Sequence, residues 1–130
     1  MDLELTSHGY LRSPNLHDGR VVGLHLVGKN ARVIVTDTSD QKFVLELVGL
    51  TNLRCSEFAE GNIIHHVIVT TKAKPTATSL RKLLGEPHPS VGEPHRARHE
   101  AWITSCEQSV LDGDLSFVEL LPSYGCEIWA

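Results

Sequence analysis

The sequence predicts an α+β domain, in which a predominantly antiparallel β-sheet of meander type carries one or two short helices on one face. Three observations favour this fold. Hydrophobic residues alternate with period two between residues 19 and 69, the period becomes helical near residue 80, and turn residues separate these stretches. A chain of 130 residues has the length of one domain, so we expect a single domain over 1–130.

The first strands are predicted to form a hairpin that a third strand extends. The stretch 19–28 places alternate apolar side chains on two faces, residues 28–30 supply a tight turn, and 31–37 alternates again. After a second turn at 38–40, the stretch 42–49 repeats the pattern. Three strands in this order predict an antiparallel meander.

The core is predicted from the residues that share one face of these strands. Side chains two positions apart in a strand point the same way, so the larger apolar members of each set should pack together. The residues expected in the core are Val22, Leu24, Leu26, Phe43, Leu45, Leu47 and either Ile63 or Ile64.

The most hydrophobic run, EGNIIHHVIVTT at 60–71, predicts a strand with two apolar faces. A strand of this kind lies inside a sheet, or against a second layer or subunit. Soluble monomers seldom expose large apolar patches. We therefore predict a symmetric homodimer whose contact includes part of the strand from Ile63 to Val69.

The second half of the chain changes character. In PTATSLRKLLGEP, Thr78 or Ser79 is suited to cap a short helix that Gly85 ends, and its leucines share one stripe. Three prolines, one glycine and three histidines crowd the stretch EPHPSVGEPHRARH, so residues 86–94 are predicted to form a surface loop.

Residues 95–110 fit either a helix or a strand. Pro94 is well placed at the first position of a helix whose stripe would contain Ala97, Ala101 and Trp102 or Cys106, whereas WITSC favours a strand. Beyond the turn at 112–114, LSFVELL and YGCEIWA are predicted to form a closing hairpin that Pro122 and Ser123 separate.

Charge and composition exclude several classes of protein. The net charge is −4, and no cluster of lysine and arginine provides the footprint for nucleic acid. The N-terminal arm, residues 1–15, lacks a signal-peptide core, and no apolar run has the length of a membrane span. Three widely spaced cysteines, Cys55, Cys106 and Cys126, suit free thiols. These observations predict a cytoplasmic protein that binds neither nucleic acid nor membrane.

Two histidine motifs have structural explanations. His65 and His66 are adjacent, and successive side chains of a regular strand point to opposite faces, so the two should not share a metal. One is expected to be hydrogen-bonded in the core and the other to lie at the surface or an interface. His17-Asp18 resembles the His-Asp pair of metal phosphohydrolases, but it precedes a strand, so we expect a turn at Asp18-Gly19.

His95 and His99 form the strongest candidate metal pair, because positions i and i+4 of a helix share one face. A metal-assisted hydrolase would need a third ligand, such as His88 or Glu100, and the chain has no HExxH or CxxC pattern. We therefore predict no catalytic residues, no bound metal and no cofactor, and keep the hydrolase as the alternative function.

Three segments carry a resemblance to a known group of proteins: LHDGRVVGLHL at 16–26, VGLTNLRCSEFAEGNII at 48–64 and LSFVELLPSYGCEIWA at 115–130. Their order resembles that in small bacterial domains, many of which are similar to immunity proteins of polymorphic toxin systems. The resemblance implies a curved antiparallel sheet with one or two helices against a face. It also implies a role in binding a protein rather than in catalysis.

Overall fold

The structure, a computed structural model, describes residues 2–130, which divide into two compact units. The first unit runs to Val69 and includes residues 118–130, and the second contains residues 70–117. The strands are β1 (Glu4–Leu5), β2 (Leu11–Ser13), β3 (Arg20–Val27), β4 (Asn30–Thr36), β5 (Lys42–Leu47), β6 (Arg54–Ser56), β7 (Asn62–Thr70), β8 (Phe117–Tyr124) and β9 (Glu127–Trp129), and the helices are α1 (Ala77–Leu84) and α2 (Glu93–Asp112).

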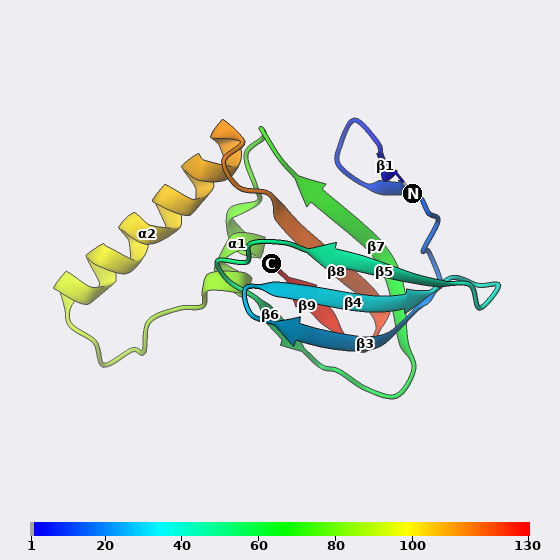
Figure 1. The fold of residues 1–130 in the computed structure, drawn as a ribbon. Helices are drawn as coiled ribbons and strands as arrows, with labels where there is room; N and C mark the ends of the chain where they lie inside the picture. Colours follow the sequence, from blue (N-terminus) through cyan, green and yellow to red (C-terminus); the bar gives the residue numbers. More distant parts are fainter. Residues whose placement is uncertain (1) are drawn as a thin grey trace. The chain divides into compact units, whose positions relative to one another are not determined.

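An antiparallel sheet of seven strands, in the order β5-β4-β3-β7-β8-β9-β6, builds the first unit, and β1 pairs with β2 separately. The predicted meander is confirmed, because β3, β4 and β5 are neighbours in chain order. In Figure 1, β3, β4 and β5 pass in front of β8 and β9. Buried residues of β3 and β4 pack with those of β7, β8 and β9, so the sheet curves around its own core. The predicted α+β class is confirmed.

The predicted core is right for β5 and for β7. Ile64 is fully buried, and Leu24, Phe43, Leu45 and Leu47 pack against the buried cluster. Val22 and Leu26 contradict the prediction, since their side chains are 51% and 59% exposed. Val21, which strict alternation would place on the face opposite Val22, is buried instead.

A β-bulge explains the exposure of Val22. Val21 lies opposite Val35, but Gly23 lies opposite Ile34, so Val22 is an extra residue without a partner on β4. An extra residue of this kind breaks the alternation of faces. Leu26 is exposed for a different reason: it pairs with Ala31 at the far end of β3, whereas β7 pairs with β3 only at Arg20 and Val21.

The second unit contains both helices. The segment left open at 95–110 is helical, and α2 already includes Glu93 and Pro94 of the predicted loop. The predicted stripe is wrong, because α2 buries Ile103 and Val110 and leaves its two alanines and Trp102 exposed. Residues 103 and 110 are seven apart, two helical turns, and so share one face.

The ends of α1 differ partly from expectation. Thr76 is the N-cap residue, so the predicted caps, Thr78 and Ser79, both lie inside the helix. Gly85 ends α1 as predicted, and its φ of 76° lies in the region that favours glycine. Neither α1 nor α2, the helices of the described residues, has the length and apolar character needed to cross a membrane.

The closing hairpin is present, but its turn is displaced. β8 pairs with β9 in antiparallel fashion and continues through Pro122 and Ser123, which were expected to separate the strands. The reversal occurs at Gly125, where φ is 84°. A positive φ favours glycine, so the turn follows the residue with the required backbone freedom.

Candidate functional site

A groove begins where β3 and β7 separate. The two strands share only two pairs, Arg20 with Ile63 and Val21 with Asn62. Immediately before Asn62, Gly61 has a φ of 99°, a conformation that turns the chain away from the line of β7. Residues 58–61 therefore leave the sheet beside β3 instead of continuing the ladder.

The side chain of Asn62 holds this divergence in place. Its Oδ1 accepts hydrogen bonds from the backbone N–H groups of Ala59 at 2.8 Å and Cys126 at 3.0 Å. Its Nδ2 donates to the carbonyl oxygens of Ala59 at 2.7 Å and Val21 at 3.3 Å. Asn62 is buried, and all four of its amide hydrogen-bonding positions have partners.

Gly125 is required next to this amide. A Cβ on residue 125 would stand 2.6 Å from Oδ1 of Asn62, closer than side chains approach one another. The turn between β8 and β9 therefore approaches Asn62 closely only because it carries no side chain. The Asn62 network joins β3, the 59–61 turn and the β8–β9 turn.

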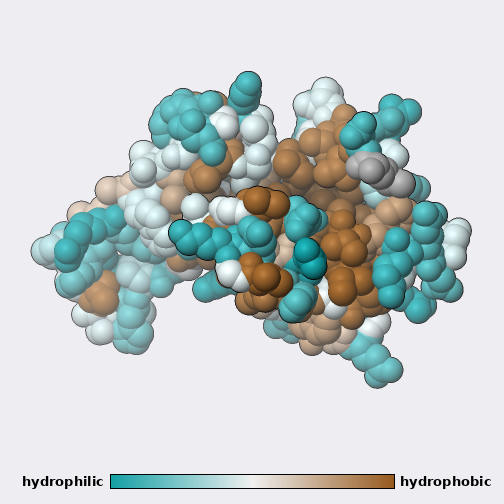
Figure 2. All heavy atoms as spheres, viewed as in Figure 1, coloured by the Kyte–Doolittle hydropathy of each residue, from teal (hydrophilic) through white to brown (hydrophobic). Residues whose placement is uncertain are grey.

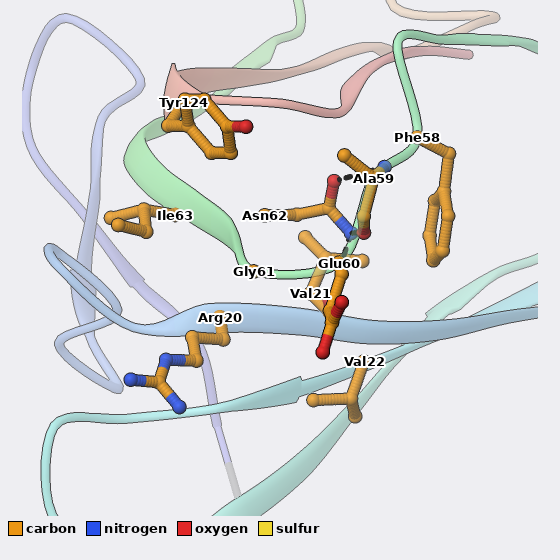
Figure 3. Close-up of a pocket in the computed structure, with 10 residues that line it drawn as sticks. All are labelled: Arg20, Val21, Val22, Phe58, Ala59, Glu60, Gly61, Asn62, Ile63 and Tyr124. Carbon is orange, nitrogen blue, oxygen red and sulfur yellow. Dashed lines mark hydrogen bonds between the residues drawn. The ribbon is translucent and has the colours of Figure 1, made fainter.

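The groove has a volume of about 810 Å³, a size typical of ligand sites. Figure 3 shows β3 along one side and the 58–61 segment along the other, with Tyr124 and Phe58 on opposite sides of the Asn62 turn. These two aromatic side chains are 62% and 53% exposed. The lining residues are Arg20, Val21, Val22, Phe58, Ala59, Glu60, Gly61, Asn62, Ile63 and Tyr124, and we refer to them as the Phe58–Tyr124 groove.

The groove offers apolar contacts and few reactive groups. Its lining contains one guanidinium, one carboxylate and one phenol, with no histidine, cysteine, serine or lysine. The amide of Asn62 is already engaged by the protein's own backbone. Exposed aromatic rings with a few polar groups around them are suited to bind an apolar segment and to orient it.

The adjacent histidines of β7 contradict the prediction. The ring centroids of His65 and His66 are 3.9 Å apart, so the two side chains lie together; His65 is exposed and His66 is only partly buried. Asn62, Ile64 and Val67 are the buried residues of β7, which shows that the alternation shifts by one residue between Ile64 and Val67. The argument from opposite faces fails because β7 is not regular there.

A third histidine joins this pair. The ring centroid of His17 lies 5.2 Å from that of His65 and 6.0 Å from that of His66. The ring of Tyr10 lies edge-on to that of His66, with 4.9 Å between the ring centroids. Burial, followed by the neighbouring His65 and His17, lowers the pKa of His66. These three imidazoles are called the histidine cluster below.

His17 also belongs to the predicted turn. Asp18 has a φ of 61°, and the N–H of Gly19 donates to the carbonyl oxygen of Leu16 at 2.9 Å, so the turn into β3 is confirmed. The carboxylate of Asp18 lies 3.1 Å from Nδ1 of His17. The pair closes the turn and orients the imidazole toward its neighbours.

The predicted metal candidates lie in the second unit. His95 and His99 are both in α2, but Nη2 of Arg98 donates to Nδ1 of His95 at 2.9 Å and Nε2 of His99 donates to the carbonyl oxygen of Gly85 at 2.8 Å. His88 is hydrogen-bonded to Ser90 through Nδ1 at 2.6 Å. In residues 2–130, no three His, Cys, Asp or Glu side chains are grouped as a metal ion requires. The absence of a bound metal stays a prediction.

Glu100, the other candidate ligand, binds Arg81 of α1 instead. The hydrogen bond from this guanidinium lowers the pKa of the Glu100 carboxyl, and Glu86 accepts a second bond from Arg81 at 2.9 Å. Arg81 thus joins α2 to the segment that follows α1, and Glu100 has a structural partner.

The cysteines are free thiols, as expected, but two of them are in contact. Sγ of Cys55 in β6 lies 3.3 Å from Sγ of Cys126, which is fully buried beside β9. Burial, together with the hydrogen bond to Cys55, raises the pKa of Cys126 to about 12. Sequence spacing gave no sign of this contact, because pairing of β6 with β9 joins distant parts of the chain.

Comparison with known proteins found no matching family model, no match among curated proteins and no match among solved structures. No sequence pattern predicted the groove, because residues 50–61 follow neither a strand nor a helix period. One signal was present: Phe58 is a large apolar residue flanked by Glu57 and Glu60 in a stretch without strand periodicity. Such a residue is suited to an exposed contact.

Proposed function

We propose that this protein is a non-catalytic protein-binding module, of the kind that the immunity proteins of polymorphic toxin systems represent, and that it binds its partner at the Phe58–Tyr124 groove. The observation that carries the proposal is the groove itself, an opening of about 810 Å³ flanked by two exposed aromatic side chains. Tyrosine and tryptophan anchors dominate the energy of many protein interfaces. The resemblance of three sequence segments to such domains supports the same class.

The surroundings of the groove favour a protein partner with positive charge. Glu57 and Glu60 flank Phe58, and the whole chain carries a net charge of −4. Opposite charges speed the encounter of two proteins and orient them. The toxin-like partner expected from the sequence is therefore a basic one.

The lining of the groove supports binding more than catalysis. Arg20 and Glu60 come from opposite walls, and neither wall provides a nucleophile next to a base. Covalent and general-base mechanisms need two such groups within hydrogen-bonding distance. A surface that holds a partner needs shape and apolar area, which this groove has.

The proposal also includes a cytoplasmic location and a homodimer, both expected from the sequence. The contact between the two copies would include part of the strand 63–69. Within the first unit, the N-terminal arm covers part of this strand, since Tyr10 bridges Ile68 and the carbonyl oxygen of Gly9 accepts from Val69 N–H at 2.9 Å. Light scattering should give twice the chain mass of 14.3 kDa, and a mass of one chain would contradict the dimer.

Photo-crosslinking in the native cell tests the binding surface. Benzoylphenylalanine is introduced at Phe58 and, as a matched control, at Val48, an exposed apolar residue 74% accessible to solvent outside the groove. We expect a crosslinked protein from position 58 that is absent from position 48. The protein is then identified by mass spectrometry, purified and titrated.

The titration decides the proposal. The purified partner should bind the wild-type chain saturably, and Phe58→Ala should weaken binding by about tenfold or more, as loss of an aromatic anchor does. A variant Val48→Ala should bind as the wild type does. No crosslink above the control, or equal affinity for Phe58→Ala and wild type, would show that the groove is not the binding surface.

A further inference from the structure

The edge of β3 next to the Phe58–Tyr124 groove is open. On one side, β3 pairs with β4 from Arg20 to Val27. On the other side, it pairs with β7 only at Arg20 and Val21. In the described residues, no strand lies beside Val22–Val27 on this second side. Along this edge, Val22, Leu26 and Val27 are 51%, 59% and 49% accessible, and Figure 2 shows hydrophobic residues at the surface over β3–β5.

Beyond the β-bulge at Val22, this edge lacks the usual protection against pairing. Its sequence, VGLHLV, contains no Lys, Arg, Asp, Glu or Pro. By contrast, the outer strand β5 carries Lys42 and Glu46, and β6 at the other end of the sheet is only three residues long. Natural sheets block free edges with charges, prolines or short strands, because an open apolar edge otherwise pairs with another chain. The composition of β3 therefore indicates that a partner covers it.

We propose that this edge binds an extended segment of the partner protein, which adds to the sheet as one more strand beside Val22–Val27 and places alternate side chains in the Phe58–Tyr124 groove. The inference rests on the function proposed above and specifies how the partner binds. Strand addition obtains affinity from main-chain hydrogen bonds, and pockets for alternate side chains supply specificity.

The local architecture creates room for such a strand. Asn62 Nδ2 caps the carbonyl oxygen of Val21, the last β3 residue paired with β7. The turn at Gly61 then carries residues 58–60 away from β3, and the groove occupies the space between them. Figure 3 shows Val22 and Glu60 facing this space from the two walls. A strand needs about 4.8 Å beside its neighbour, and the groove begins at the residue where the native ladder stops.

A single segment fits this space better than a second copy of the chain. β3 of a second copy would arrive with β4 on one side and its own 58–61 wall on the other. The second copy would therefore have to fit its own β4 and its own 58–61 segment next to the 58–61 segment of the first copy. A segment extended from a partner has no such neighbours, so it can follow the edge of β3 closely.

The charges specify the chemistry of the segment. The edge itself is uncharged, whereas Glu60 in the lining and Glu57 beside it place carboxylates along the opposite wall. The segment that complements them alternates apolar residues with lysine or arginine and has free backbone N–H groups. Proline within it would remove a donor from the ladder.

A defined peptide tests the mode of binding. The probe is a capped peptide of about seven residues, matched to the open edge at about 3.3 Å per residue, in which valine alternates with lysine and threonine. We expect saturable binding with a Kd below about 1 mM. Hydrogen–deuterium exchange should show slower exchange at the amides of Val22–Val27. A peptide of the same sequence, N-methylated on every residue so that neither edge can pair, should bind about tenfold more weakly or worse.

Two variants of the protein provide a matched pair. Leu26→Lys places a positive charge on the open edge, and Val48→Lys places one at an exposed apolar position outside it. The first should weaken binding of the basic peptide, and the second should leave it unchanged. Near-identical circular dichroism spectra of both variants would show that each still folds.

The negative results for strand addition differ from those for the proposed binding function. Binding without slower exchange in Val22–Val27, or equal binding of the N-methylated peptide, would overturn strand addition while leaving the groove as the site. Absence of peptide binding would also overturn strand addition. The wider function is decided separately by the crosslink at position 58 and by Phe58→Ala.

Discussion

The side-chain amide of Asn62 donates a hydrogen bond to the carbonyl oxygen of Val21 at 3.3 Å, at the last pair that joins β3 to β7. This bond replaces the next backbone bond of the ladder. The same side chain holds Ala59 and Cys126 through their backbone groups. Asn62 is therefore the residue that both ends the strand pairing and shapes the groove.

We expect Asn62→Ala to lower the free energy of unfolding by about 3 kcal/mol, because it leaves several buried backbone groups without partners. The control is Asn15→Ala, since Asn15 is exposed and accepts only one bond, from His17 N–H at 3.2 Å. This control should cost less than about 1 kcal/mol. Equal urea denaturation midpoints for the two variants would contradict the role of Asn62.

Because of the bulge in β3, two valines should differ in how much they contribute to the free energy of unfolding. Val35 is fully buried, whereas Val22 is 51% exposed at the bulge. Val35→Ala should lower the free energy of unfolding by about 2 kcal/mol through lost burial and the cavity left behind. Val22→Ala should change it by less than about 0.5 kcal/mol, as exposed substitutions do. Chemical denaturation measures both free energies. A larger loss for Val22→Ala than for Val35→Ala would show that Val22 belongs to the core, as the sequence predicted.

The histidine cluster predicts a pH dependence of stability. The pKa of His66 is lowered by burial and by the nearby His65 and His17, and Tyr10 also faces its ring. Between this lowered pKa and about 6.5, the unfolded chain binds a proton that the native protein does not. The contribution of His66 is therefore complete above about pH 6.5 and is lost progressively as the pH falls toward the lowered pKa.

Denaturation midpoints measured between about pH 5 and 7.5 check this direction. His66→Gln should flatten the part of the profile below about pH 6.5. His8→Gln serves as the control, since His8 is exposed in the N-terminal arm. A profile of His66→Gln that coincides with the wild type would show that His66 does not contribute.

The two neighbouring thiols predict selective chemical reactivity. Cys126 is fully buried and its pKa is raised to about 12, so almost none of it is thiolate near neutral pH. Since the thiolate is the reactive form, iodoacetamide should modify Cys126 at least about 100-fold more slowly in the native protein than in urea. Mass spectrometry of peptides from timed reactions gives both rates. Equal rates in the two conditions would mean that the thiol is accessible.

The sequence by itself determined the elements that depend on local patterns. Period-two hydrophobicity and the turn at 28–30 predicted the β3–β4 hairpin, and the same alternation predicted β5. Gly85 marked the end of α1, because few other residues tolerate its positive φ. These features follow from neighbours within a few residues, which is the range over which a pattern in one sequence is informative.

The tertiary structure alone decided the faces and the site. One extra residue at Val22 puts Val21 on the same face as Leu24, and an irregular step puts Ile64 on the same face as Val67, and no local pattern marks either shift. The groove depends on Asn62 reaching Val21, Ala59 and Cys126, which are separated from it by 41, 3 and 64 positions. Contacts over such separations form only when the strands pair in the folded protein. The residues next to each partner in the sequence show no pattern that would predict the contact.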